Sequence, residues 1–277
     1  MDSQTLVFVF AVIMFFSVAA FGYIPLTLEL SSNRLKQLTA IGAGVLIGSA
    51  FLVILPEALE IFEGHEEEGH EEESHEEEGH EEQGHEEESH IEPSTIGLAI
   101  LGGFVLMLLL ETFGLPHAVH HDEDKDLLGL SATIGLIVHA IVDGIAVGAS
   151  VSSSTETGLV VFVAIMLHKG PAAFGLFSFL KHIKIPASKS KIYLFSFALA
   201  SPIASILTFF ILKDTSFATN DNIGLALLFS AGTFIYVATV DVLPEVHSHD
   251  HNQDSPVWSV ILGIILVFLS TLIGHGH

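Results

Sequence analysis

Long apolar runs recur along most of this chain, and short polar stretches separate them. Each run approaches the ~20 residues that a helix needs to cross the hydrocarbon core of a bilayer. The pattern predicts eight transmembrane helices, over residues 5–24, 38–62, 95–115, 130–152, 158–180, 192–212, 223–243 and 257–273. The first run has Asp2 where a signal peptide has basic residues, so we expect it to be retained. The sequence therefore predicts an all-α polytopic membrane protein, a bundle of eight transmembrane helices forming one domain over residues 1–277.

Residues 63–92 interrupt this pattern between the second and third spans. A five-residue unit repeats there, in "GHEEEGHEEESHEEEGHEEQGHEEESH", with one histidine followed by a run that is mostly glutamate. Five residues on a helix advance about 500°, so successive histidines never share a face. Low complexity and dense like charge predict a disordered loop. Its six histidines are His65, His70, His75, His80, His85 and His90.

Imidazole and carboxylate are both zinc ligands, and a disordered loop binds with modest affinity and fast exchange. We therefore interpret the repeat as a metal-capture loop. The alternative is an acidic spacer that only keeps the loop soluble, although acids alone would do that without histidine.

Charge and composition exclude several classes of protein. The chain is 50% hydrophobic and has 9 Lys+Arg against 33 Asp+Glu, a formal net charge of −24. Sixteen of the acids lie between Glu63 and Glu92. Such a chain is a poor partner for nucleic acid. Cysteine is absent, which excludes disulfides, thiolate metal sites and thiol redox chemistry.

The basic residues predict the orientation in the membrane. Eight spans place seven of them on one side, Lys213 on the other and Lys169 inside a span; the seven are Arg34, Lys36, Lys125, Lys181, Lys184, Lys189 and Lys191. By the positive-inside rule the richer side is cytosolic. Both termini and the repeat loop then face the lumen or the outside. Two short histidine clusters fall on the cytosolic side: His117, His120 and His121, and His247, His249 and His251.

Four polar residues lie in the middle of the fourth and fifth spans. His139 and Asp143 are four residues apart and share a helix face, and His168 and Lys169 follow in the next span. At 1.5 Å per residue, Asp143, His168 and His139 lie roughly 13.5, 15 and 20 Å from the outer ends of their spans. Antiparallel neighbours joined by a short turn bring these groups together near the bilayer centre. Two imidazoles and a carboxylate form a partial coordination shell for a divalent metal.

Two other interpretations remain open at this point. Asp143 and Lys169 would form an ion pair that holds the two helices together, or the histidines would be hydrogen-bonded interior residues. Ionisable groups inside a membrane are costly, which favours a functional role. Weaker candidates for guiding ions are Glu57 near the outer end of the second span, and Asp241 and Glu245 near the cytosolic end of the seventh. Gly44 and Gly48, like Gly144 and Gly148, form small-xxx-small edges typical of close helix packing.

These residues resemble the ZIP (Zrt/Irt-like) family of divalent metal transporters, whose usual patterns are HSxxDGxAxGA in the fourth span and HExPHExG in the fifth. The matching stretches are "HAIVDGIAVGA" and "HKGPAAFG", and "VILPEAL" and "AGTFIYVATVDVLPE" in the second and seventh spans are also similar. The resemblance implies that His139, Asp143 and His168 form the transport site of a single transmembrane transporter domain. The departures from the family pattern are Lys169, Ala172, Val53 and Ser201.

Lys169 stands where the family usually has a glutamate ligand, so it does not carry over as a ligand. We expect its ammonium to substitute for a second metal ion and leave a single-metal site. A sequence with lysine after this histidine resembles the branch of ZIP member nine. That resemblance implies that the protein resides in the Golgi, in another secretory-pathway membrane or at the cell surface. The resemblance also implies a homodimer.

The sequence thus predicts a transporter that moves zinc, or alternatively Fe²⁺ or Mn²⁺, from the outside or an organelle lumen into the cytosol by alternating access. The metal is the substrate, and we expect no cofactor and no enzymatic activity. A zinc-sensing receptor that binds without conducting is the main alternative. An intramembrane metal hydrolase is a weaker one, because HExxH is absent and no glutamate lies near the proposed metal.

Overall fold

The computed structural model describes residues 2–29, 31–67, 92–114, 123–244 and 256–274. Within these ranges every regular element is a helix, which confirms the predicted fold class. The elements are α1 (Ser3–Thr27), α2 (Ser32–Ser49), the π-helix η1 (Ala50–Ile54), α3 (Leu55–Glu67), α4 (Pro93–Gly114), α5 (Glu123–Ser153), α6 (Thr155–His182), α7 (Ala187–Leu212), α8 (Asn220–Tyr236), the π-helix η2 (Val237–Val242) and α10 (Val257–Gly274).

Seven helical segments in the described part are long and apolar enough to cross a membrane. They match the first seven predicted spans, with α2, η1 and α3 joined into one span and α8 and η2 into another. The eighth predicted span is α10, whose apolar part, Val257–Leu272, is a shorter helix. The helix that ends in α3 runs to Glu67, past the point where the repeat loop was expected to begin. The backbone at His65 is therefore helical, and the other five loop histidines lie outside the described residues.

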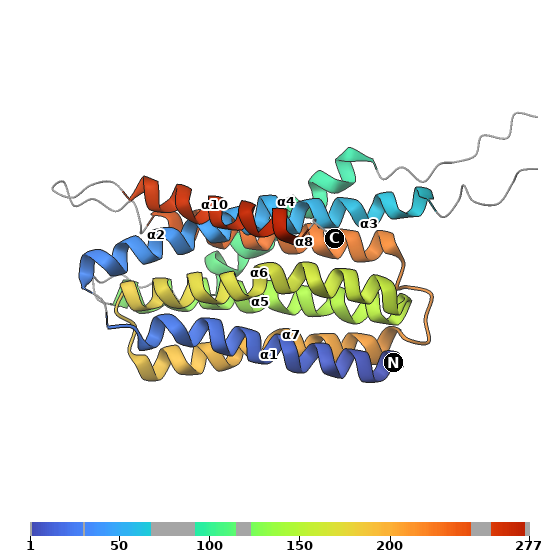
Figure 1. Cartoon of the computed structure of the whole chain (residues 1–277), viewed down its shortest axis with the longest axis horizontal. Helices are drawn as coiled ribbons and strands as arrows, with labels where there is room; N and C mark the ends of the chain where they lie inside the picture. The colour runs from blue at the N-terminus through green and yellow to red at the C-terminus, as the bar shows by residue number, and fades with distance from the viewer. Residues whose placement is uncertain (1, 30, 68–91, 115–122, 245–255, 275–277) are drawn as a thin grey trace, which may run out of the picture.

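The helices are arranged so that α5 and α6 lie between two other groups (Figure 1). In this view α1 and α7 run along one side of them, and α2, α3, α8 and α10 along the other. α5 packs against α6, α7 and α8, while α6 packs against α1 and α2. The two helices that carry the predicted metal ligands are thus covered by protein on both sides.

Both π-helices precede a proline. Pro56 follows η1 and Pro244 follows η2, each as the second residue of a Leu-Pro-Glu sequence. Proline lacks an N–H and its ring clashes with the carbonyl four residues earlier. In the structure the leucine N–H before each proline bonds to a carbonyl five residues back, Leu55 to Ala50 and Leu243 to Ala238. The widened turn lets each helix continue past its proline.

Glycines allow several helix pairs to approach closely. A Cβ added at Gly44 would lie 2.0 Å from the Val260 carbonyl oxygen of α10, and one at Gly144 would lie 2.5 Å from the Ser201 carbonyl oxygen of α7. Both small-xxx-small edges predicted from the sequence therefore lie at close helix contacts, which is the packing role expected for them.

The two ends of α1 are held by side chains. At its start, the Asp2 carboxylate accepts hydrogen bonds from the Thr5 hydroxyl at 2.7 Å and the Thr5 N–H at 3.4 Å. The bond from the hydroxyl lowers the pKa of Asp2 below its usual value. At the other end, the Lys181 ammonium of α6 donates to the carbonyls of Pro25, Leu26 and Leu28. A cation at a helix C-terminus bonds otherwise unpaired carbonyls and complements the helix dipole.

Candidate metal site

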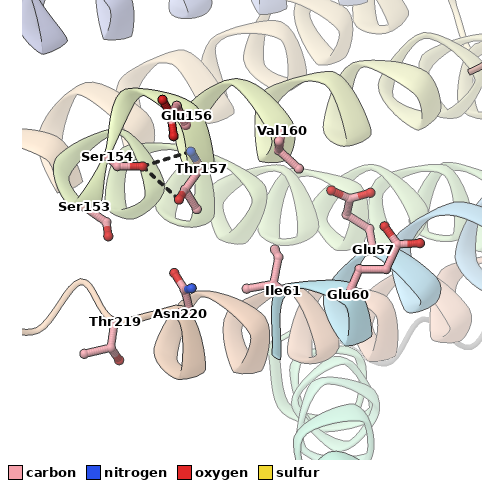
Figure 2. Close-up of a pocket in the computed structure, with 10 residues that line it drawn as sticks. All are labelled: Glu57, Glu60, Ile61, Ser153, Ser154, Glu156, Thr157, Val160, Thr219 and Asn220. Carbon is pink, nitrogen blue, oxygen red and sulfur yellow. Dashed lines mark hydrogen bonds between the residues drawn. The ribbon is translucent and has the colours of Figure 1, made fainter. Parts of the chain in front are cut away.

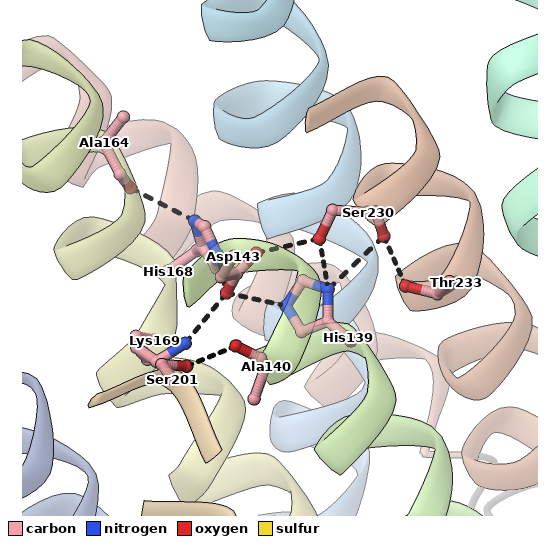
Figure 3. Close-up of polar contacts among 9 residues, drawn as sticks. All are labelled: His139, Ala140, Asp143, Ala164, His168, Lys169, Ser201, Ser230 and Thr233. Atoms are coloured by element: carbon pink, nitrogen blue, oxygen red, sulfur yellow. Dashed lines mark hydrogen bonds and ion pairs between the residues drawn. The ribbon is translucent and has the colours of Figure 1, made fainter. Parts of the chain in front are cut away.

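The four polar residues predicted to meet inside the membrane do meet (Figure 3). His139 and Asp143 come from α5, and His168 and Lys169 come from α6. Each is at most 1% exposed to solvent. Their contact follows from the antiparallel packing of α5 and α6, which the turn at Ser154 joins.

Main-chain carbonyls orient both imidazoles. His168 Nδ1 lies 3.1 Å from the Ala164 carbonyl oxygen, and His139 Nδ1 lies 3.3 Å from the Ser230 carbonyl oxygen. A carbonyl only accepts hydrogen bonds, so Nδ1 of each ring carries the proton that it donates. In the neutral ring, Nε2 then keeps its lone pair for a metal ion.

The two Nε2 atoms converge on one carboxylate oxygen. His139 Nε2 and His168 Nε2 each lie 3.3 Å from Asp143 Oδ2. In a tetrahedral zinc site with ligands about 2.0 to 2.1 Å from the metal, two ligand atoms lie about 3.3 Å apart. One ligand atom from each of the three residues can be chosen so that all lie within 4.8 Å of one another. The arrangement therefore needs little movement to coordinate a divalent cation.

Lys169 contacts the same oxygen. Its ammonium donates a hydrogen bond of 2.9 Å to Asp143 Oδ2. The ion pair and the hydrogen-bonded histidines, the two alternatives to a metal site, are thus both present as contacts. The ion pair neutralises the carboxylate, but neither alternative uses the Nε2 atoms of both histidines, which lie 3.3 Å from the same oxygen and remain able to bind a divalent cation.

Sequence reasoning missed Ser230 of α8. Its hydroxyl lies 2.8 Å from His139 Nδ1 and donates a 2.8 Å hydrogen bond to Asp143 Oδ1. Because the hydroxyl proton goes to the carboxylate, its oxygen accepts from His139. Phe234, one turn later on α8, packs against both imidazoles, with ring centroids 4.4 Å from His139 and 6.1 Å from His168. The sequence offered one indication of its role, because Ser230 is a polar residue in the middle of an apolar span.

Glu57 lies away from these four residues, in a pocket of about 700 Å³ (Figure 2). The pocket is at the end of the bundle where α5 turns into α6, the side predicted to face outward. Glu57 and Glu60 of α3 line it with Glu156, and Ser154 and Thr219 contribute hydroxyl groups. The pocket therefore presents carboxylates and hydroxyls at the predicted outer mouth.

Asp241 lies in η2 and is 2% exposed. Within the described residues, its carboxylate lies beside the Ser131 hydroxyl of α5 but makes no hydrogen bond of ordinary geometry. Near the same end of the bundle, the Tyr236 hydroxyl donates a hydrogen bond to the Glu111 carboxylate of α4. Glu245 and the two short histidine clusters lie outside the described residues.

Comparison with known proteins identifies the family. The model of the family described as "ZIP Zinc transporter" matches residues 4–127 and 116–271. The chain is 39% identical to zinc transporter ZIP9-B of Xenopus laevis over 305 residues, and 39% identical to zinc transporter ZIP9 of Micropogonias undulatus over 312 residues, with all of each chain covered. It is also 26% identical to zinc transporter zipt-7.2 of Caenorhabditis elegans over 313 residues, which cover 97% of this chain and 66% of that one. These matches confirm the resemblance found in the motifs, and the chain belongs to the ZIP zinc transporter family.

Proposed function

We propose that this protein transports Zn²⁺ across a membrane into the cytosol through the buried site formed by His139, Asp143 and His168. The observation that carries the proposal is the convergence of two imidazole Nε2 atoms on Asp143 Oδ2 at 3.3 Å each. Both rings are oriented by their Nδ1 hydrogen bonds, which prepares Nε2 for a metal. The family membership and the names of the relatives support zinc as the metal. Fe²⁺ and Mn²⁺ use the same ligand types and are alternative substrates.

The donor set suits transport better than permanent binding. Two neutral imidazoles and one carboxylate select a divalent metal without the strong retention of a thiolate site. A carrier must release its ion, and alternating access about a midplane site requires moderate affinity. The proposal includes no enzymatic activity, in keeping with relatives that are named transporters.

The route to the site begins at the outer pocket. Glu57 lines that pocket, and its helix α3 leads directly toward the histidine-acid repeat. We propose that the repeat captures metal and that Glu57 guides it inward, while Asp241 and Glu245 guide it out at the opposite end. The burial of Asp241 in the widened turn of η2 supports a place for a cation there, since a buried carboxylate with few polar partners is costly.

Three further assignments rest on family membership. We propose a homodimer, residence in the Golgi, another secretory-pathway membrane or the cell surface, and lumenal or extracellular termini. The positive-inside distribution of Lys and Arg supports the orientation.

Flux of ⁶⁵Zn²⁺ into proteoliposomes that hold the full-length chain tests the proposal. We expect rapid uptake by the native protein and a loss of at least about tenfold in His168→Ala, because the mutation removes one of three ligands. His182→Ala is the matched control: His182 ends the same helix α6, outside the site, and this variant should transport like the native protein. Zinc binding without flux in the native protein would instead support a sensor, and equal flux in native protein and His168→Ala would exclude this site.

A further inference from the structure

We infer that the Lys169 ammonium is a tethered counter-ion that competes with the transported metal for Asp143 Oδ2, leaving when the metal binds and returning when it is released. The inference rests on the proposed function and adds a role for a residue that is not a metal ligand. It concerns the exchange of one cation for another.

The contacts on Asp143 show why the two cations exclude each other. Oδ1 is held by the Ser230 hydroxyl at 2.8 Å. Oδ2 faces both Nε2 atoms at 3.3 Å and also accepts the hydrogen bond from Lys169 at 2.9 Å. A metal bound by the two imidazoles must therefore use the oxygen that the ammonium occupies. A divalent ion and an ammonium on one buried oxygen repel strongly, because little solvent screens them.

Charge balance favours exchange over joint occupancy. Asp143 and Lys169 form a neutral pair at a place that is at most 1% exposed. A divalent cation added to this pair would leave a net charge of about +2 in the protein interior, which is unfavourable. If the ammonium moves aside, the metal takes over its contact with the carboxylate. The four-carbon side chain of lysine is long and flexible enough to move its ammonium in this way.

The exchange has a consequence at each half of the transport cycle. When the metal arrives, it must displace the ammonium, so affinity is lower than the three ligands alone would give. When the metal departs, the ammonium neutralises Asp143, so the carrier returns without an unpaired buried carboxylate. From the sequence we expect the Lys169 ammonium to take the place of a second metal ion. On this inference it does so only in the metal-loaded carrier, after it has moved off Oδ2.

The test uses Lys169→Met in the purified full-length protein, with zinc affinity measured by competition against a fluorescent chelator. We expect zinc to bind about tenfold more tightly or better, because its competitor is gone. In proteoliposomes both KM and the maximal rate of uptake should fall, since release and return become slower. Lys169→Gln keeps a hydrogen-bond donor without the charge and should also bind zinc more tightly. If Lys169→Met does not fold, the zinc affinity of Lys169→Gln tests the inference in its place.

Thermal unfolding separates this role from simple pairing. With EDTA, Lys169→Met should unfold at a lower temperature than the native protein, because Asp143 loses its partner. With zinc, the variant should gain more in Tm than the native protein does. Lys181→Met is the matched control on α6: it removes a lysine that bonds the end of α1, so it should lower Tm equally with and without zinc and leave zinc affinity unchanged.

Unchanged or weaker zinc binding in both Lys169 variants would overturn the inference and leave Lys169 as a structural partner. Failure of the proposed function gives a different result. If the buried site does not bind the metal, the native protein and His168→Ala would bind zinc equally; if the protein is a sensor, the two would differ in binding and neither would conduct, whatever the Lys169 variants show.

Discussion

At the scale of single residues, one carboxylate is contacted by side chains from three helices. Asp143 of α5 contacts His168 and Lys169 of α6 through Oδ2 and Ser230 of α8 through Oδ1. Ser230 also bonds His139 Nδ1, so it fixes the carboxylate and an imidazole together. Hydrogen bonds of this kind hold ligands in place for a metal, and the one that His139 donates through Nδ1 also makes its Nε2 a better ligand.

Ser230→Ala should weaken zinc binding by roughly 10 to 100-fold, the usual effect of removing a partner that orients a ligand. The main-chain carbonyl of residue 230 remains in the variant, so His139 keeps one of its contacts and binding should not vanish. Isothermal titration with zinc on the purified protein measures the change.

Ser205→Ala serves as the comparison for this prediction. Ser205 is also a fully buried serine, but its hydroxyl bonds the Pro202 carbonyl within α7. Its zinc affinity should match that of the native protein. Equal losses of zinc affinity in the two variants would mean that replacing any buried serine weakens binding. Ser230 would then have no specific role in orienting the ligands.

At the scale of helices, close contacts and widened turns decide where the side chains lie. Gly44 brings α2 against α10, and Gly144 brings α5 against α7. The π-helix η2 changes the register of its helix immediately before Pro244 and places Asp241 in the interior. Such turns often occur at functional positions, because the extra residue redirects the side chains that follow.

Gly44→Ala should lower the free energy of unfolding by about 1 to 3 kcal/mol, the usual range for overpacking. The added Cβ would lie 2.0 Å from a backbone oxygen, so one helix has to move. Thermal unfolding in detergent measures the loss. Gly97→Ala on α4 is the control, because a Cβ there has no atom within 4 Å, and alanine favours a helix over glycine. A Gly44→Ala protein as stable as Gly97→Ala would mean that α2 and α10 are not held closely together.

At the scale of the whole molecule, the site lies on the two central helices of the bundle. α5 and α6 are covered by α1 and α7 on one side and by α2, α3 and α8 on the other (Figure 1). This arrangement is consistent with the proposed route along the bundle, which has the pocket beside Glu57 at one end and Asp241 of η2 toward the other.

Zinc uptake should weaken when the outer compartment is acidified from about pH 7.5 to about pH 5.5, because a protonated imidazole cannot bind metal. Acid favours the protonated form, so the sign of the effect is a loss of uptake at low pH. Flux at subsaturating zinc, measured across this range, tests it. A variant with all six repeat histidines replaced by glutamine assigns the effect: a loss of acid sensitivity in that variant places it in the repeat, and sensitivity that remains places it elsewhere in the protein. A flat profile in the native protein would contradict the prediction.

The sequence predicted the helices and the centre of the site well, since both depend on short-range patterns. Apolar run length located the spans, and the four-residue spacing put His139 and Asp143 on one face. Ser230 could not be predicted in the same way, because its place beside Asp143 depends on how α8 packs against α5. The π-helices were also missed, because a proline within a helix can be accommodated in several ways and the surrounding packing decides which one the backbone adopts.

The main-chain carbonyl of Ala164 shows how a functional group can escape detection by mutagenesis. It orients the His168 ring, yet every residue type at position 164 supplies the same group. A substitution there that fits the available space would leave the ring orientation intact. A mutational scan would then record a tolerant position, although its backbone performs a necessary task. Functional groups of this kind leave no trace in residue identity and become visible only in three dimensions.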